Sequence, residues 1–558
     1  MFYDHKIWVG NSGDEKVYIY PKMANRHGMI AGATGTGKTV TLKVLAESFS
    51  SCGVPVFMAD VKGDLAAMCR PGEENEKIRE RMDAMKLEEH GYDFQSYPTT
   101  YWDIYAEKGM PLRTTISEMG PLLLGRILDL NDTQSDILTI IFKIADDEGL
   151  LLLDTKDLKS MIQYVSEHSK EYAMEYGNMA KQSLAAILRA VVALEAEGGD
   201  KFFGETALNI TDWMCTSYEG KGTIQVLDCQ KLINNPTMYS TFLLWMMSEL
   251  FETLPEAGDR DRPKMVFFFD EAHLLFDNAS KTLLTKIEQV VKLIRSKGVG
   301  IYFITQNPKD IPEGIMGQLG TKIQHALRAY TPAEQKAAKA AAQSFRENPA
   351  FDTFEAITQL ATGEALVSTL DEEGIPTVVQ KCIILPPQSQ MGALDDVIRK
   401  DEMINNLLYA KYAQEMDRES AYEVLAKKVV AEAEEIAARK AAVEAEKQKL
   451  KEEEAARKAA EKEALALEKQ KEREVAAAEK QRLKEEEAAR KAAEKEEAAK
   501  DRRRKSALKK VATSATGTIG REIGNEIGEA VGGKFGKRLG GNVGASLGRG
   551  ILSTLFKI

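Results

Sequence analysis

The sequence is short of cysteine and lacks any long apolar run. Its 558 residues include five cysteines, which are scattered without metal-ligand spacing. No window of about 18 uncharged apolar residues occurs, so no transmembrane helix is expected. The first residues, MFYDHKIWVGNSG, lack the basic, apolar and small-residue progression of a secretory signal. These absences predict a cytoplasmic protein whose cysteines are reduced thiols.

Charge is distributed unevenly along the chain. Residues 401–558 hold 34 Lys and Arg and 30 Asp and Glu, which leaves 41 basic and 56 acidic residues, a net charge of −15, in residues 1–400. Because phosphate contacts dominate non-specific affinity for DNA, this acidic part disfavours DNA wrapped around its outside. A basic pore inside an acidic ring is still compatible with the composition.

Apolar runs separated by helical patterns continue to about Gln390. Strands joined by helical crossovers predict an α/β sheet. From roughly Glu73 to Cys215 no strand is expected, and helical periodicity there predicts a helical insertion in the sheet. The expected strands are Val54–Asp60, Thr223–Asp228, Lys264–Asp270, Gly300–Thr305, Lys322–Ala329 and Glu364–Leu370.

The stretch MIAGATGTGKTV, residues 29–40, has the Walker A spacing of a phosphate-binding loop. Its glycines let successive backbone amides point at phosphate oxygens, Lys38 supplies a cation and Thr39 a hydroxyl for magnesium. The helix that begins near Lys38 adds its N-terminal dipole. A chance glycine-rich turn is the alternative, although the apolar lead-in and the following helix give the required context. The predicted nucleotide-binding residues are Gly32, Ala33, Thr34, Gly35, Thr36, Gly37, Lys38 and Thr39.

A second acidic site follows the apolar run MVFFF, residues 265–269. A buried central strand would deliver Asp270 and Glu271 to its carboxyl end. Asp270 is expected to join Thr39 as a magnesium ligand, and Glu271 to polarise the attacking water, so that the chemistry is phosphoryl transfer to water. The alternative is a strand followed by a solvated acidic turn.

Two later positions are candidates for catalytic roles. Gln306 ends the apolar run GVGIYFIT, where a side chain that senses the γ-phosphate is expected, or it caps the turn before Pro308. Arg328 lies near the end of another expected strand and could stabilise transition-state charge in a neighbouring subunit. Arg295 competes for that role, and a plain surface arginine is a third interpretation.

Five ordered segments resemble one family. RHGMIAGATGTGKT, MADVKGDLAAM, FFFDEAHLLF, GVGIYFITQNP and QHALRAYTP are similar to the HerA-like branch of the HerA/FtsK superfamily, close to the bacterial YjgR-type ATPases. The resemblance covers about residues 1–400. It implies a RecA-like P-loop NTPase core that often works as a hexameric ring, with ATP and Mg²⁺ as cofactors.

The same resemblance assigns roles to individual residues. Those that match the family's nucleotide site are Lys38, Thr39, Asp270, Glu271 and Gln306, while Arg328 matches the place of a finger acting in trans. The segment Asp60–Asp64 resembles the loop after the second strand, without a settled role. The resemblance and the composition together predict an ATPase domain over residues 1–400 with its insertion at about 73–215, a charged helix over 401–510 and a glycine-rich segment over 511–558.

The charged helix contains an internal repeat. Glu446–Glu463 returns nearly unchanged at Glu479–Glu496, an offset of 33 residues. Three eleven-residue periods fit a straight or slightly right-handed helix, and i,i+4 ion pairs support it. Large apolar residues are sparse, so a free-standing helical spacer is as compatible with the pattern as a coiled coil.

The last segment carries a glycine at every fourth position from Gly520 to Gly548, each after an apolar residue. On a helix this pattern permits very close approach of a second helix, which favours self-association or a protein partner. A flexible glycine-rich tail is the alternative.

The leading functional hypothesis is an ATPase of the HerA/FtsK type that couples hydrolysis to nucleic-acid translocation or remodelling. An ATP-dependent switch or scaffold that acts on protein partners without moving DNA is the alternative. A homo-oligomer is expected in both cases, because proteins of the family that it resembles often form hexameric rings.

Overall fold

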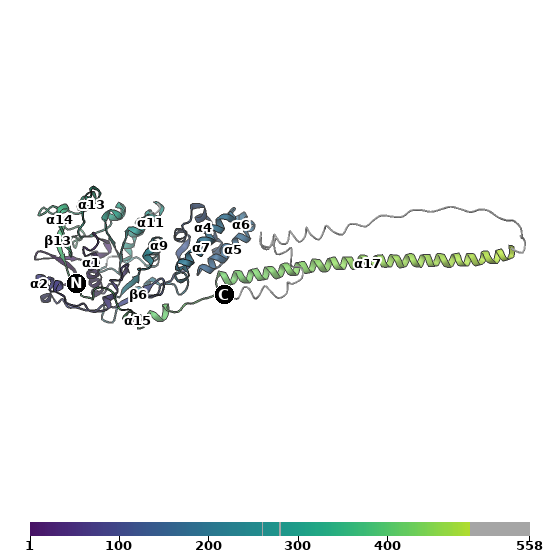
Figure 1. The fold of residues 1–558 in the computed structure, drawn as a ribbon, viewed down its shortest axis with the longest axis horizontal. Coiled ribbons are helices and arrows are strands. Elements are labelled where there is room, and N and C mark those ends of the chain that lie inside the picture. The colour runs from purple at the N-terminus through teal and green to yellow at the C-terminus, as the bar shows by residue number, and fades with distance from the viewer. Residues whose placement is uncertain (259, 278–280, 491–558) are drawn as a thin grey trace. The chain divides into compact units, whose positions relative to one another are not determined.

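A 13-stranded sheet lies at the centre of the chain in the computed structural model, which describes residues 1–258, 260–277 and 281–490 (Figure 1). The strand order is β1-β2-β13-β12-β11-β4-β10-β9-β5-β8-β6-β7, and β3 pairs with β2. In chain order the strands are β1 (Phe2–Tyr3), β2 (Lys6–Ser12), β3 (Glu15–Ile19), β4 (Gly28–Ala31), β5 (Val56–Asp60), β6 (Thr99–Asp103), β7 (Met110–Pro111), β8 (Ile224–Asp228), β9 (Met265–Phe269), β10 (Val299–Thr305), β11 (Thr321–Gln324), β12 (Glu364–Ser368) and β13 (Gln380–Ile384).

The sheet has a parallel and an antiparallel part. Every pairing from β11 through β4, β10, β9, β5, β8 and β6 to β7 is parallel, whereas β12, β13, β2, β1 and β3 join antiparallel. The carboxyl ends of β4, β10 and β9 therefore meet at one edge, with β10 in the middle. In open α/β sheets ligands bind at that edge.

Helices cover both faces of the parallel part. Strand β9 is buried throughout, and its residues alternate between two cores. Val266 and Phe268 face the core that contains α1 (Lys38–Ser51), whereas Phe267 and Phe269 face the core of α9 (Pro236–Thr253) and α11 (Lys281–Ile294). A run that is apolar at every position is the pattern of a strand covered on both sides, so the predicted α/β fold is confirmed.

The helical insertion is shorter than the sequence predicts. Strands β6 and β7 lie within residues 73–215 and extend the parallel sheet, so the expectation of no strand there was wrong for Thr99–Pro111. The helical part begins after β7, and Figure 1 shows α4, α5, α6 and α7 grouped together, away from α13 and α14. Its helices are α3 (Ile116–Ile127), α4 (Asp132–Asp147), α5 (Thr155–Glu167), α6 (Ser169–Tyr176), α7 (Lys181–Leu194) and α8 (Asp200–Phe202).

The predicted run Lys322–Ala329 is strand only over its first part, because β11 ends at Gln324 and the following residues approach the phosphate-binding loop instead. The remaining helices of the described residues are α2 (Glu76–Met85), α10 (His273–Phe276), α12 (Glu313–Met316), α13 (Pro332–Gln343), α14 (Thr353–Gln359), α15 (Asp396–Ile404), α16 (Tyr409–Tyr412) and α17 (Ala421–Arg490).

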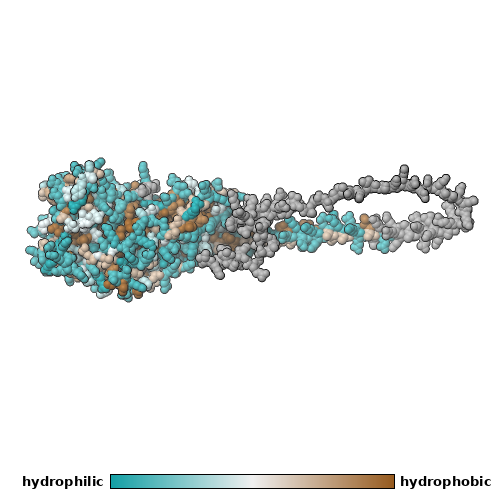
Figure 2. Space-filling model, viewed as in Figure 1, coloured by the Kyte–Doolittle hydropathy of each residue, from teal (hydrophilic) through white to brown (hydrophobic). Residues whose placement is uncertain are grey.

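Residues 443–558 form a second unit, separate from residues 1–442. Its described part belongs to the 70-residue helix α17, whose visible surface is largely hydrophilic in Figure 2. Among its described side chains, large apolar ones such as Val443, Leu450 and Leu465 are exposed. The glycine-rich segment 511–558 and the second copy of the repeat beyond Arg490 lie outside the described residues, so both stay predictions. Over the described ranges, no helix is both long and apolar enough to cross a membrane.

A buried histidine directly before β4 forms hydrogen bonds with α11 and β10. His27 follows the 3₁₀ helix η1 (Pro21–Arg26); its Nε2 lies 2.8 Å from the carbonyl oxygen of Val291, and its Nδ1 accepts the N–H of Ile301 at 3.0 Å. The acceptor role of Nδ1 requires the neutral ring. Burial lowers the pKa of His27 to about 4.

We predict that His27 makes the unfolding free energy depend on pH. The folded pKa of about 4 lies below the unfolded value of about 6.5. The stability that the neutral His27 ring contributes is therefore complete above pH 6.5 and is lost as the pH falls toward 4. Between pH 7 and pH 5, the unfolding free energy of wild type should fall by about 2 kcal/mol more than that of His27→Gln. The control variant His5→Gln changes an exposed histidine, and its unfolding free energy should depend on pH as in wild type. Equal pH slopes for wild type and His27→Gln would contradict this. Urea unfolding can be followed by tryptophan fluorescence, because all four tryptophans lie in residues 1–442, at Trp8, Trp102, Trp213 and Trp245.

Candidate nucleotide-binding site

The loop between β4 and α1 depends on its glycines. Gly32, Gly35 and Gly37 have φ values of 152°, 76° and 114°, in the region that side chains rarely adopt. A Cβ built on Gly32 would lie 2.6 Å from the Cβ of His325. The sequence therefore folds here into an open loop whose backbone can come close to a ligand, at the N-terminus of a 14-residue helix.

Lys38 closes this loop on itself. Its Nζ donates to the carbonyl oxygens of Gly32 at 2.6 Å and of Ala33 at 3.0 Å. Burial lowers the pKa of Lys38 and Lys62 lowers it further, while Asp270 and Glu271 oppose them. A cation held only by backbone carbonyls can exchange these partners for phosphate oxygens.

Three backbone hydrogen bonds fix the loop to both halves of the sheet. The N–H of Gly32 donates to Thr305 O on β10 at 3.3 Å, and the N–H of Ala33 donates to Ala326 O after β11 at 2.9 Å. The carbonyl oxygen of Thr36 accepts the N–H of Gly363, just before β12, at 3.1 Å. The loop is thus preorganised rather than mobile between its two flanks.

The two predicted carboxylates follow β9 as expected. Asp270 is partly buried; its Oδ1 accepts the N–H of Glu271 at 2.9 Å, and burial, followed by the charge of Glu271, raises the pKa of Asp270 to about 6. Glu271 has a φ of 48°, an uncommon value for a residue with a side chain. Its carboxylate also lies 3.4 Å from Nδ1 of His273.

Gln306 connects the loop with Glu271. Its Nε2 lies 3.4 Å from both carboxylate oxygens of Glu271, and its Oε1 lies 3.5 Å from the hydroxyl of Thr34. The turn that follows is capped by Asn307, whose side chain accepts the N–H of Lys309. The sequence left open whether Gln306 caps that turn, and the geometry gives this task to its neighbour.

The residues present fit a magnesium ion bound together with phosphates. Thr39 lies in the first turn of α1 and Asp270 at the end of β9, and hydroxyl and carboxylate oxygens are the donors that Mg²⁺ prefers. Among the residues that the structure describes, no group of three or more His, Cys, Asp or Glu side chains could hold a metal. This small protein donor set suits an ion that takes its other ligands from phosphates and water.

His325 is a site residue that sequence reasoning missed. It is fully buried beneath the loop; its Nδ1 donates to Glu364 O at 2.9 Å, which leaves Nε2 to accept the hydroxyl of Thr41 at 2.8 Å. Burial lowers the pKa of His325 to about 4, so the ring is neutral. The sequence signal was its place in the segment QHALRAYTP, for which no role of His325 was predicted.

The segment after β5 has a definite structural role. Asp60 accepts the N–H groups of Gly63 at 2.7 Å, Asp64 at 3.1 Å and Leu65 at 3.1 Å, so its carboxylate shapes the turn rather than facing a ligand. Burial and the charge of Asp64 raise the pKa of Asp60 to about 6. This turn brings Lys62 close enough to influence Lys38 and Asp270 electrostatically.

Neither candidate arginine is part of the phosphate-binding loop. Arg328 is exposed in the segment between β11 and α13, so it is not part of a strand. Arg295 begins the 3₁₀ helix η7 (Arg295–Lys297) directly before β10. It therefore lies at the amino end of the parallel strands, opposite the edge that carries the phosphate-binding loop.

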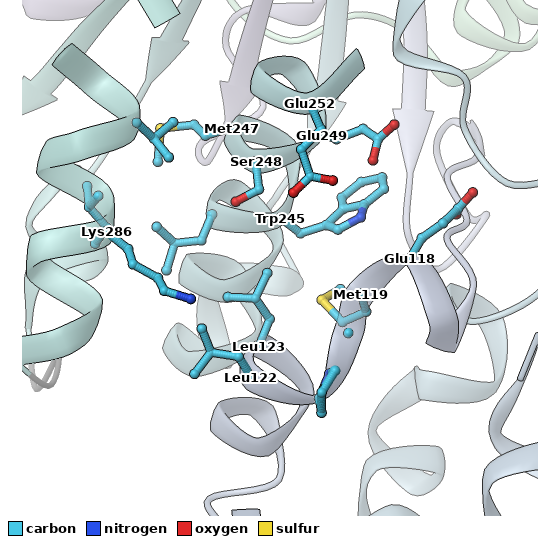
Figure 3. Close-up of a pocket in the computed structure, with 15 residues that line it drawn as sticks. Glu118, Met119, Leu122, Leu123, Trp245, Met247, Ser248, Glu249, Glu252 and Lys286 are labelled. Atoms are coloured by element: carbon cyan, nitrogen blue, oxygen red, sulfur yellow. The ribbon is translucent and has the colours of Figure 1, made fainter. Parts of the chain in front are cut away.

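A separate pocket lies between α3, α9 and α11 (Figure 3). It combines apolar residues such as Met119 and Trp245 with the carboxylates of Glu118 and Glu249. Glu118 already accepts the N–H of Thr115 at the start of α3. None of the predicted site residues lines this pocket, so it is distinct from the phosphate-binding loop.

The parallel sheet, the glycine loop and the two acids after β9 define a RecA-like P-loop NTPase fold. Residues 6–540 match the family model described as "Helicase HerA-like C-terminal", and the chain belongs to this family. The predicted resemblance is thereby confirmed.

Two curated relatives are similar over parts of the chain. A probable helicase of Methanocaldococcus jannaschii is 28% identical over 194 residues, 33% of this chain and 33% of the relative. The DNA double-strand break repair helicase HerA of Sulfolobus acidocaldarius is 22% identical over 371 residues, 64% of this chain and 65% of the relative. The chain thus spans less than two thirds of either relative.

Solved structures show more distant similarity. The bacterial conjugative coupling protein TrwB aligns with a TM-score of 0.45 at 14% identity, covering 69% of this chain and 90% of that one. VirB4 of Thermoanaerobacter pseudethanolicus aligns with a TM-score of 0.45 at 17% identity, covering 69% and 98%.

We predict that Lys38→Ala weakens the binding of MgADP at least tenfold, because charge-assisted hydrogen bonds to phosphate are lost. Lys22→Ala is the matched control, since Lys22 is exposed on η1 at the opposite edge of the sheet. Calorimetric titration of both variants measures the effect. Equal affinities for Lys38→Ala and wild type would show that the loop does not bind phosphate.

Proposed function

We propose that this protein hydrolyses ATP with Mg²⁺. The observation that carries the proposal is the contact of Gln306 with both Thr34 and Glu271, which brings the ends of β4, β10 and β9 to one point. Lys38 and the loop amides would neutralise and orient the phosphates, and Thr39 and Asp270 would hold the magnesium ion. The ion, when bound, supplies charge stabilisation on the phosphoryl oxygens.

The proposed water-activating group is Glu271. Its carboxylate is held by Gln306 and His273 and is directed by the unusual backbone conformation at position 271. A carboxylate fixed in this way can orient a water molecule and accept its proton. Gln306, between Glu271 and Thr34, is placed to contact that water or the terminal phosphate.

We further propose that hydrolysis drives translocation or remodelling of nucleic acid. Both curated relatives are named as helicases, and one of them as a DNA repair helicase. The second candidate function is an ATP-dependent switch or scaffold for protein partners, which the net charge of −15 over residues 1–400 favours.

Hydrolysis measured with and without DNA separates the two functions. We expect single- or double-stranded DNA to raise the ATPase rate of wild type several-fold. Glu271→Gln should bind MgATP like wild type and lose about 100-fold or more in turnover, because the general base is removed while the phosphate contacts are kept. Equal turnover by wild type and Glu271→Gln would refute the assignment, and an ATPase indifferent to DNA would favour the switch.

The proposed active assembly is a homo-oligomer, with a hexameric ring as the expected form. A finger from a neighbouring subunit raises the rate by orders of magnitude in other P-loop NTPases. Arg328 is the first candidate for this role. Arg295 is the second, and its place at the edge opposite the chain's own loop suits a contact with another subunit.

Mixing variants tests whether a finger acts between subunits. We predict that Arg328→Ala subunits mixed with Glu271→Gln subunits regain part of the ATPase activity, since some sites then combine an intact Glu271 with an intact Arg328. The same mixture made with Arg295→Ala tests the competitor. If mixed oligomers form and neither mixture regains activity, no finger acts in trans at these positions.

A further inference from the structure

Helix α2 lies against the first turns of α1, close to the phosphate-binding loop. Its side chains Ile78 and Met82 belong to the same apolar cluster as Val40 and Val44 of α1. Asn75 caps α2 by accepting the N–H of Ile78 at 3.0 Å. The helix is therefore a fixed element of the core at this point, and Arg81 projects from it.

Two glycines allow Arg81 to approach the loop closely. A Cβ built on Gly37 would lie 3.3 Å from the backbone nitrogen of Gly363, and a Cβ built on Gly363 would lie 2.5 Å from Nη2 of Arg81. Gly363 has a φ of 84° and donates its N–H to Thr36 O at 3.1 Å. The guanidinium thus occupies the space beside Gly363 that a side chain there would fill.

The partners of Arg81 are few for a half-buried cation. Its Nη1 donates to Ile384 O at 3.1 Å, and no carboxylate of the described residues lies within ion-pair distance of it. The nearby Glu364 is engaged by Lys381 at 3.2 Å and by the N–H of Ala361 at 2.9 Å. Burial lowers the pKa of Arg81, and the charge of Glu364 opposes this without forming an ion pair.

Its neighbour Arg79 shows the contrast on the same helix. Arg79 is exposed and lies within 4 Å of three carboxylates, those of Glu74 at 3.6 Å, Asp83 at 3.2 Å and Glu88 at 2.8 Å. Solvent-exposed pairs of this kind contribute little. The partly buried arginine without a carboxylate is the one beside the phosphate-binding loop.

The position of Arg81 relative to the sheet indicates which end of a nucleotide it would meet. The groups for the terminal phosphate, Asp270, Glu271 and Gln306, lie on the β10 and β9 side of β4. Arg81 lies on the other side, next to Gly363 and Ile384 of the β12 and β13 region. A nucleotide with its terminal phosphate toward Glu271 would extend its nucleoside toward Arg81.

We propose that Arg81 is a nucleotide-binding residue whose guanidinium stacks on the base. A planar, weakly hydrated cation packs well against an aromatic ring, and the desolvated setting strengthens that contact. The inference rests on nucleotide binding by the proposed function and adds the residue that recognises the nucleoside half.

Titration of MgADP into the full chain tests this role without requiring turnover. Arg81→Ala should weaken MgADP binding about tenfold, which is the loss expected for one stacked, charge-assisted contact. In ATP hydrolysis the same variant should raise KM and leave kcat close to wild type, because the contact is equal in ground and transition states. Arg79→Ala is the matched control and should bind MgADP like wild type.

Two further measurements separate stacking from a phosphate contact. Arg81→Lys keeps the charge but not the plane, so it should lose nearly as much MgADP affinity as Arg81→Ala. Magnesium tripolyphosphate, which has no base, should bind wild type and Arg81→Ala equally. Retained ADP affinity in Arg81→Lys, or an equal loss of tripolyphosphate affinity in Arg81→Ala, would overturn the stacking role.

The outcome for wild type distinguishes this inference from the proposed function. If wild type binds MgADP and Arg81→Ala binds it equally well, the inference fails while the proposed function stands. If wild type binds no MgADP, both fail. Tryptophan fluorescence melting of Arg81→Ala, expected close to wild type, shows that an affinity loss does not come from unfolding.

Discussion

The parallel pairing of β4, β10 and β9 is the constraint on which the rest of the site depends. Buried on both faces, these three strands can only end at a common edge, and each ends in a different chemical group. A loop of glycines and Lys38 follows β4, an amide follows β10 and two carboxylates follow β9. Because β10 lies between the others, Gln306 is the natural link between phosphate-binding loop and acid, and its contacts with Thr34 and Glu271 follow from strand order alone.

Most of this centre could be predicted from the sequence because its signals are local. Residues 29–40 and 265–271 are short stretches in which apolar runs, glycines and charges have one physical interpretation, and they fold accordingly. Strands β6 and β7 were missed for the opposite reason, since five and two residues of mixed polarity at a sheet edge carry no periodic signal. The sequence left open whether Gln306 caps the turn before Pro308. In the structure Asn307 caps this turn, since asparagine is a preferred N-cap residue.

The residues that sequence reasoning missed act over long sequence separations. His325 meets Thr41 across 284 positions, and Arg81 meets Ile384 across 303. His325 lies within the segment QHALRAYTP but has no assigned role there, and Arg81 lies outside all five segments. Each contact exists only after β11, β12 and β13 have paired beside β4. Buried polar groups of this kind are specified by tertiary structure, and their cost without partners explains why His325 uses both ring nitrogens.

The three backbone hydrogen bonds of the phosphate-binding loop have a mechanical consequence. One is made with the parallel strand β10 and two with segments that lead out of β11 and into β12. A loop clamped on both flanks cannot yield to a ligand on one side alone. Thr36 is thereby connected through Gly363 to the antiparallel edge, where β13 and β2 bring the first residues of the chain into the same sheet.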